Sequence, residues 1–140
     1  MRHLPIDPAL FIENRQRLMK KMARSSLAVV NANDVLPRNS DAVSLIVPQT
    51  DLFHLAGIEQ EETILVLCPG SFDESLREVL FIRESSELLK IWEGYKHTKD
   101  DASKISGIRN VQWLSEFPAV FHRLMCEVET VYLNSNEHPR

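Results

Sequence analysis

The chain of 140 residues has few of the features that mark a catalytic domain. It contains no Cys-x-x-Cys and no His-Glu-x-x-His, and its five histidines are scattered without the spacing of metal ligands. No Gly-x-Ser-x-Gly turn offers a nucleophile, and no glycine-rich loop offers a phosphate site, because the four glycines stand singly. We therefore assign no catalytic and no metal-binding residue to this chain.

A basic excess and a long apolar run are also missing. The 16 Lys and Arg against 20 Asp and Glu give a formal charge of -4, which argues against binding to a phosphate backbone. No apolar stretch approaches the ~20 residues that span a bilayer, and residues 1–8 lack the apolar core of a signal peptide. Cys68 and Cys126 are expected to be buried free thiols rather than a disulfide. These features predict a cytoplasmic protein without nucleic-acid or membrane partners.

The residues that are present suit one folded domain with alternating helices and strands. Hydrophobic residues make up 44% of the chain and charged residues 26%, which is typical of a globular domain of this size. Periodicity and turn formers predict helices at about 8–23, 50–57, 101–106 and 115–128, and strands at about 26–32, 43–47, 63–68, 78–83, 110–114 and 130–134. Residues 85–92 stay open between helix and strand. The order predicts an α/β domain with a mixed sheet and helices on both faces.

Several helix ends can be assigned from their chemistry. Asp7 before a proline is expected to cap the first helix. Thr50 or Asp51 is expected to cap the second, and Gly57 to end it in a left-handed conformation. Ser115 is expected to cap the last helix.

Three sets of polar residues are candidates for chemistry. His54 is expected to be a structural or surface imidazole rather than a ligand. Glu61 and Glu62 are expected to be solvated charges rather than an acid–base pair, because adjacent side chains of an extended segment point to opposite faces. Arg38 and Asn39 are candidates for contact with a substrate carboxylate, since a fixed guanidinium can clamp one, although such residues also tie loops together.

Four stretches of the sequence form a recognisable pattern. They are Pro37-Arg38-Asn39-Ser40-Asp41, Gln49-Thr50-Asp51-Leu52-Phe53-His54-Leu55-Ala56-Gly57-Ile58, Glu61-Glu62-Thr63-Ile64-Leu65-Val66-Leu67-Cys68-Pro69 and Ile91-Trp92-Glu93-Gly94. Together they resemble the N-terminal domain of the creatinase, prolidase and aminopeptidase P family, in its aminopeptidase P branch. The resemblance covers nearly all of the chain and departs at residues 46–49, where relatives often carry an aromatic-Arg-Gln phrase.

The resemblance implies a fold and a role for the chain. Residues 1–140 would be a non-catalytic N-terminal α/β domain of ribonuclease H-like topology, inactive alone. A catalytic domain of pita-bread shape would follow it in the same polypeptide, outside this chain. That domain would hold a dinuclear, usually manganese, site whose five ligands, two Asp, one His and two Glu, have no counterpart here, and would cleave peptides with proline second.

In the family the first domain also forms oligomer contacts and shapes access to the catalytic cleft. Trp92 is the candidate for this role, with an ordinary core tryptophan as the alternative. Other identities stay open: a prolidase, which cleaves dipeptides only, a relative that has lost its metal ligands and binds peptides in a chaperone-like role, or a free-standing α/β binding domain.

Overall fold

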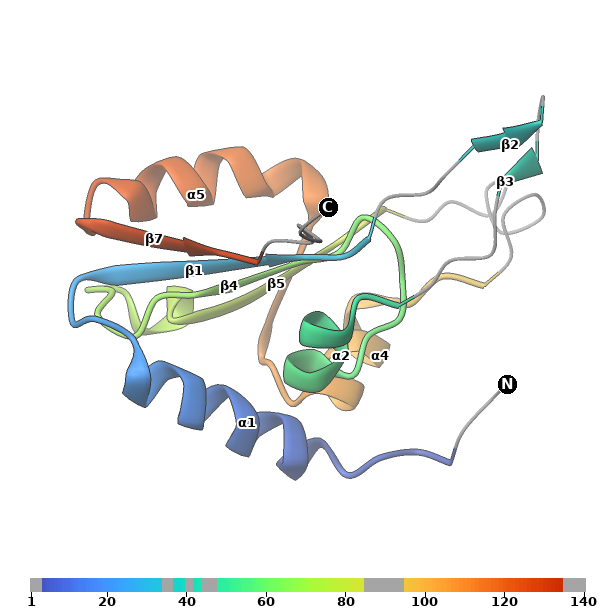
Figure 1. The fold of residues 1–140 in the computed structure, drawn as a ribbon, viewed down its shortest axis with the longest axis horizontal. Helices are drawn as coiled ribbons and strands as arrows, with labels where there is room; N and C mark the ends of the chain where they lie inside the picture. The colour runs from blue at the N-terminus through green and yellow to red at the C-terminus, as the bar shows by residue number, and fades with distance from the viewer. Residues whose placement is uncertain (1–3, 34–36, 40–41, 44–47, 85–94, 135–140) are drawn as a thin grey trace, which may run out of the picture.

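A five-stranded mixed sheet forms the centre of the molecule (Figure 1). The computed structural model describes residues 4–33, 37–39, 42–43, 48–84 and 95–134, with the backbone alone for 37–39 and 42–43. The strands of the sheet are β1 (Ser26–Asn31), β4 (Ile64–Leu67), β5 (Glu78–Ile82), β6 (Asn110–Trp113) and β7 (Thr130–Leu133). Their spatial order is β6-β5-β4-β1-β7, with β4 antiparallel to both neighbours and the two outer pairs parallel.

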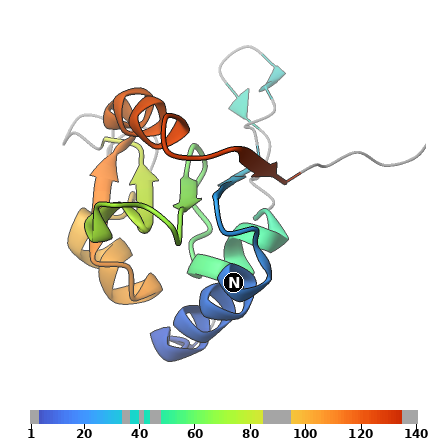
Figure 2. The same cartoon turned by 90° about the vertical axis from the view of Figure 1, so that its left-hand side faces the viewer.

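Helices cover both faces of this sheet, as Figure 2 shows. The helices are α1 (Pro8–Lys21), α2 (Thr50–Ala56), α4 (Lys99–Ser106) and α5 (Phe117–Met125), with short 3-10 turns η1 (Glu74–Leu76) and η2 (Leu114–Glu116). α1, α2 and α4 lie on one face and α5 on the other. The α/β domain with a mixed sheet and helices on both faces is confirmed. A separate antiparallel pair, β2 (Pro37–Asn39) with β3 (Ala42–Val43), stands away from one end of the sheet.

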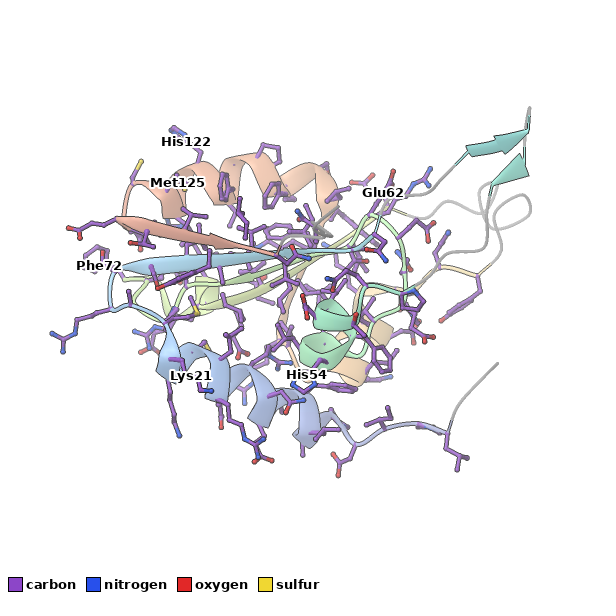
Figure 3. The ribbon with its side chains drawn as sticks, viewed as in Figure 1. Lys21, His54, Glu62, Phe72, His122 and Met125 are labelled. Carbon is purple, nitrogen blue, oxygen red and sulfur yellow. The ribbon has the colours of Figure 1, made fainter. Side chains whose placement is uncertain are left out.

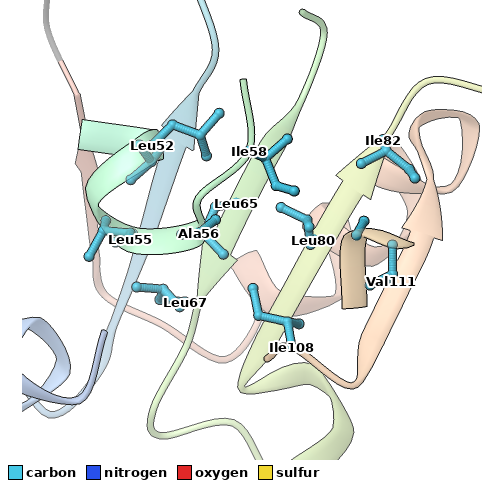
Figure 4. Packing of buried hydrophobic residues seen from close by; sticks show 13 residues of the cluster. Leu52, Leu55, Ala56, Ile58, Leu65, Leu67, Leu80, Ile82, Ile108 and Val111 are labelled. Atoms are coloured by element: carbon cyan, nitrogen blue, oxygen red, sulfur yellow. The ribbon is translucent and has the colours of Figure 1, made fainter. Parts of the chain in front are cut away.

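Side chains of the three central strands alternate between two apolar clusters, as the twofold period of a strand requires. The cluster under α2 and α4, drawn in Figure 4, takes Ala28 and Val30 from β1, Leu65 and Leu67 from β4, and Leu80 and Ile82 from β5. The cluster under α5 takes Leu27 and Val29, Val66 and Cys68, and Val79 and Phe81. Burial on both faces explains why these strands are near-continuous apolar runs in the sequence.

Two of the predicted helix ends are confirmed and two are wrong. Asp7 accepts from Ala9 N at 2.9 Å at the start of α1, and Gly57 ends α2 with φ +69°. The cap of α2 is Gln49 instead of Thr50 or Asp51, because the longer side chain brings its Oε1 to 2.7 Å from Leu52 N. Ser115 does not cap α5: it lies inside η2, whereas an N-cap residue needs extended backbone.

Three further expectations need correction or fall wholly or partly outside the described residues. Cys68 is a buried free thiol as predicted, but Cys126 is exposed. It lies two residues, and so about 200° around the helix, from the buried Leu124. The strand expected at 43–47 is present at Ala42–Val43, while 44–47 and the open segment 85–92 lie outside the described residues. Within the described residues, no helix has the length and apolar character needed to cross a membrane.

Candidate functional site

Of the candidate residues from the sequence, Arg38 and Asn39 belong to a segment that leaves one end of the sheet. Arg38 and Asn39 lie on β2, where the backbone alone is described, and Trp92 lies outside the described residues. The β2–β3 pair follows β1, and residues 85–94 connect the region after β5 to α4. The carboxyl ends of β1, β5, β6 and β7 meet at this end, because β1 runs parallel to β7, β5 runs parallel to β6, and β4 is antiparallel to both β1 and β5. Ligands of open α/β sheets bind preferentially beyond the carboxyl ends of the strands.

Residues 59–62, called here the 59–62 turn, lie at this end of the sheet within the connection from α2 to β4. The backbone turns at Glu61 and Glu62, and Glu62 is left-handed with φ +52°. Figure 3 shows Glu62 at the end of the sheet from which β2 and β3 project, far from Phe72 and His122 at the other end. A glutamate in this conformation is uncommon. The turn therefore departs from the extended segment that the sequence predicted.

This departure changes the environment of the two neighbouring glutamates. Glu61, expected to be solvated, is 4% exposed, and its Oε1 accepts from Lys96 Nζ, which is itself buried. Glu62 is exposed, and its Oε2 lies 3.2 Å from Arg83 Nε in an ion pair. The prediction of a solvated Glu61 is wrong, because its carboxylate pairs with the buried ammonium of Lys96, 35 positions away in the sequence.

A second contact ties the same turn to the chain next to Lys96. His97 N donates to Gln60 Oε1 at 2.8 Å. The buried Gln60 Nε2 and His97 Nδ1 have no hydrogen-bond partner among the described residues. Burial lowers the pKa of His97, so the neutral imidazole is favoured.

The start of α4 adds a surface network to this end. Thr98 Oγ1 accepts from Asp101 N at 3.1 Å, and the Asp101 carboxylate accepts in turn from the Thr98 backbone, which is a capping box. Tyr95 Oη also donates to Asp101 Oδ2. The hydrogen bond from Tyr95, followed by those from Thr98, lowers the pKa of Asp101 to about 2.

A different buried cation lies at the opposite end of β5. Arg15, fully buried on α1, donates from Nε to Glu78 Oε1 at 3.2 Å and from Nη1 to Leu55 O and Ser106 O at 2.7 and 2.9 Å. The two carbonyls belong to the last turns of α2 and α4, where the helix dipole favours a cation. Arg15 therefore joins three helices and one strand.

Two open depressions lie among the described residues. One groove of about 550 Å³ lies between α1, α2 and the sheet edge, with Leu18, Met22, Leu55, Tyr132 and Leu133 in its wall. A wider, more polar depression of about 1470 Å³ lies at the other end of the sheet, between α1, η1 and α5. Neither contains Arg38, Asn39 or Trp92 among its described lining residues.

The described side chains give no assembly suited to hydrolysis. Among them, no group of three or more His, Cys, Asp or Glu side chains is placed to hold a metal ion. Burial, followed by the nearby Glu127 carboxylate, raises the pKa of the Cys68 thiol, which keeps it protonated and a poor nucleophile. His54 is exposed on α2, as expected for a surface imidazole.

Comparison with known proteins identifies the fold. Residues 11–132 match the family model described as aminopeptidase P, N-terminal domain. The chain belongs to this family. It is 27% identical over 128 residues to the Xaa-Pro aminopeptidase of Escherichia coli K12, a match that covers 91% of this chain and 29% of that protein.

Solved structures of aminopeptidases P share the fold. A candidate aminopeptidase P from Bacillus anthracis superposes with a TM-score of 0.85 at 26% identity, over 96% of this chain and 32% of that chain. Aminopeptidase PepP of Pseudomonas aeruginosa gives the same TM-score at 23% identity, over 98% of this chain and 30% of that chain, and shows the fold alone. This chain thus spans about three tenths of the length of these aminopeptidases P.

Sequence reasoning found the segments that form this end of the domain but missed the residues that tie them together. Glu61 and Lys96 are 35 positions apart, and nothing in the local pattern distinguishes them from solvated charges. Arg15 did leave a signal, since it shares the apolar face of α1 with Phe11 and Leu18.

Proposed function

We propose that this chain is the N-terminal, non-catalytic domain of a cytoplasmic Xaa-Pro aminopeptidase, residues 1–140 preceding a catalytic domain of pita-bread shape. The observation that carries the proposal is the family match over residues 11–132, together with 27% identity to an Xaa-Pro aminopeptidase over 91% of the chain. The parent enzyme would remove the residue before a proline in second position, using two manganese ions held by its catalytic domain. Two cysteines without a disulfide fit a reducing compartment.

The role proposed for this domain is to form oligomer contacts and to shape access to the catalytic cleft. Trp92, Arg38 and Asn39 are the residues proposed for that access. Support comes from the position of β2, which carries Arg38 and Asn39 and follows β1 at the carboxyl end of that strand. Trp92 lies outside the described residues.

The groove beside β7 is the surface we propose for contact with the catalytic domain. Tyr132 and Leu133 line it and are 43% and 69% exposed, and an exposed apolar patch on a domain favours an interface. Asn134, which comes directly after β7, also lines this groove. Leu133→Ser in the full-length enzyme should weaken domain contact and increase proteolysis between the domains, whereas Leu10→Ser, an exposed leucine of α1, should not.

The test of the whole proposal is turnover by the full-length protein. Release of the first residue from an Xaa-Pro-Yaa tripeptide, dependent on manganese and abolished by chelation, is the expected result, while the 140-residue chain alone should show none. Cleavage of Xaa-Pro dipeptides only would identify a prolidase instead. Tight peptide binding without turnover would identify a non-catalytic, chaperone-like relative.

A further inference from the structure

The loop between β4 and η1 presents Phe72 to solvent. Phe72 is 88% exposed, and Figure 3 shows it at the end of the sheet opposite to Glu62. A single exposed apolar side chain is ordinary on a protein surface. Phe72 differs from this ordinary case because hydrogen bonds fix the backbone on both sides of it.

Ser71, on one side of Phe72, is tied to the body of the domain. It is 1% exposed, its N donates to Cys68 O at 3.0 Å, and its Oγ donates to Glu127 Oε2 at 3.0 Å. The carbonyl of Ser71 accepts from Arg77 Nε at 3.2 Å. Phe72 N donates to the same Glu127 oxygen at 3.2 Å. The loop is thereby bound to the chain that follows α5.

Asp73, on the other side of Phe72, is also held by several contacts. Its Oδ1 accepts from Ser75 N at 3.0 Å and from Ser75 Oγ at 2.6 Å, which caps η1. Its Oδ2 accepts from Arg123 Nη2 of α5 at 3.2 Å. An aromatic side chain with few rotatable bonds, carried on a fixed backbone, loses little conformational freedom on binding. Phe72 therefore has the properties of an anchor residue in a protein interface.

The exposed end of α5 lies next to this loop. Met125 is 40% exposed and Cys126 is exposed, and Glu127, which follows them directly, accepts from Phe72 N. Figure 3 shows Phe72 and Met125 at the same end of the molecule. We call Phe72, Met125 and Cys126 the Phe72 surface. Since Phe72 is 88% exposed, Met125 of the same chain does not cover its ring.

The Phe72 surface is complementary to itself. A methionine adapts its shape to an aromatic ring and makes favourable sulfur–ring contacts, so Met125 of one copy suits Phe72 of another. In a twofold pair every such contact occurs twice. The edge of the surface carries charges of both signs, since Asp73 and Arg123 are 34% and 58% exposed, and each can face the opposite charge of a second copy. A second copy thus supplies both the apolar and the charged groups that this surface requires.

We propose that a second copy of this chain docks on the Phe72 surface in a twofold arrangement, with Phe72 of each copy against Met125 of the other. The inference deepens the oligomer contact of the proposed function and rests on that part of it. A phenylalanine buries about 150–250 Å², whereas a stable interface takes roughly 800 Å² from each partner. The Phe72 surface is therefore the centre of an interface, and 140-residue chains should associate weakly, with a Kd on the order of 10–100 μM.

Sedimentation of the 140-residue chain tests the docking. The average mass should rise from that of a monomer towards that of a dimer between about 5 and 500 μM. Phe72→Ser and Met125→Glu should each raise the Kd by about tenfold or more. Tyr95→Ser is the matched control, because it removes an aromatic residue that is 67% exposed at the end of the sheet that carries the 59–62 turn, and it should leave the Kd unchanged. Circular dichroism checks that all three variants are folded.

The thiol of Cys126 shows whether the association covers this surface. Cys68 is buried and Cys126 is exposed, so the rate of alkylation by N-ethylmaleimide reports on Cys126. The rate should fall several-fold as the chain passes from monomer to dimer, and in Phe72→Ser it should keep the monomer value. Three results would each overturn the proposal: a chain that stays monomeric over the whole concentration range, a Phe72→Ser variant that associates like the unchanged chain, or a dimer with an unchanged alkylation rate.

The full-length protein separates this inference from the proposed function. With both correct, it hydrolyses Xaa-Pro peptides, and Phe72→Ser raises the concentration at which its oligomer dissociates by about tenfold. An active full-length oligomer that is unaffected by Phe72→Ser would overturn the docking surface alone. A full-length protein without turnover, whose association still depends on Phe72, would overturn the proposed function and leave the docking surface standing.

Discussion

Two buried cations at opposite ends of β5 are held in contrasting ways. Arg15 donates to a carboxylate and to the terminal carbonyls of two helices, whereas the described hydrogen bond of Lys96 Nζ goes to one carboxylate oxygen of Glu61. A planar guanidinium presents several donors in fixed directions, while an ammonium acts as a compact charge on a flexible stem. The contacts of Arg15 join helices to one another. The contact of Lys96 joins the 59–62 turn to the residues that precede α4.

The contrast teaches what each site can tolerate. Glu61 and Lys96 compensate each other's buried charge. Replacing both residues together therefore leaves no unpaired charge in the interior. The carbonyls of Leu55 and Ser106 cannot be removed by mutation, because they belong to the backbone. Without Arg15 they would lose a donor in the interior, where an unsatisfied group costs about 1–3 kcal/mol.

The largest effect is therefore expected at Arg15. Arg15→Met should lower the free energy of unfolding by about 3–5 kcal/mol, measured by urea denaturation. Adding Glu78→Leu should recover little of the loss, since the two carbonyls stay without their donor. Arg17→Met, which removes an exposed ion pair with Glu13 one turn away, should cost less than about 0.5 kcal/mol. Full recovery of the free energy of unfolding in Arg15→Met with Glu78→Leu would show that the Arg15 site and the Lys96 site do not differ in this way.

The next effect tests Lys96 in the same way. Lys96→Met should cost about 3 kcal/mol, because it leaves the Glu61 carboxylate buried and uncompensated. In contrast to the Arg15 site, adding Glu61→Leu should return most of the lost stability. The coupling free energy from this double-mutant cycle is the quantity to measure. A double variant as unstable as Lys96→Met would show that further groups depend on the pair.

The sequence predicted the features that depend on local signals and missed those that depend on long-range pairs. The three central strands and α2 came from local signals: apolar runs with β-branched residues, a capping position and Gly57. The sequence did not identify Gln49 as the cap of α2, because N-cap propensities favour the shorter side chains of Thr50 and Asp51. The partners of long-range pairs left no local signal, as Glu61 with Lys96 and Arg15 with Ser106 show. The place of Arg15 on the apolar face of α1 indicated its burial but not its partners. Family resemblance supplied the domain's identity, which periodicity could not.

A smaller effect is expected at the glycines that end α2 and α4, the helices whose last carbonyls bind Arg15. Gly57→Ala should cost about 2 kcal/mol, because the backbone is left-handed and the new Cβ would lie 2.5 Å from the Phe11 ring. Gly107→Ala, with φ +72° and the flexible end of Ile12 as its neighbour, should cost about 1 kcal/mol. Thermal unfolding of both variants checks which loses more stability. Equal losses would contradict the role of the rigid Phe11 ring.

The smallest effect concerns pH and the surface network beside Lys96. Because the pKa of Asp101 is about 2 in the folded chain, below the ordinary value of 3.8, its stabilisation is present above pH 4 and is lost as pH falls towards 2. Tyr95 makes the largest contribution to this shift. Tyr95→Phe should therefore raise the pKa of Asp101 and move the loss of stability to higher pH, whereas Tyr132→Phe should not. The difference between the two variants in unfolding midpoint across pH 2–5 is the measurement. Identical pH profiles would show that Thr98 alone sets the pKa, and that this end of the domain depends on its buried pair rather than on its surface network.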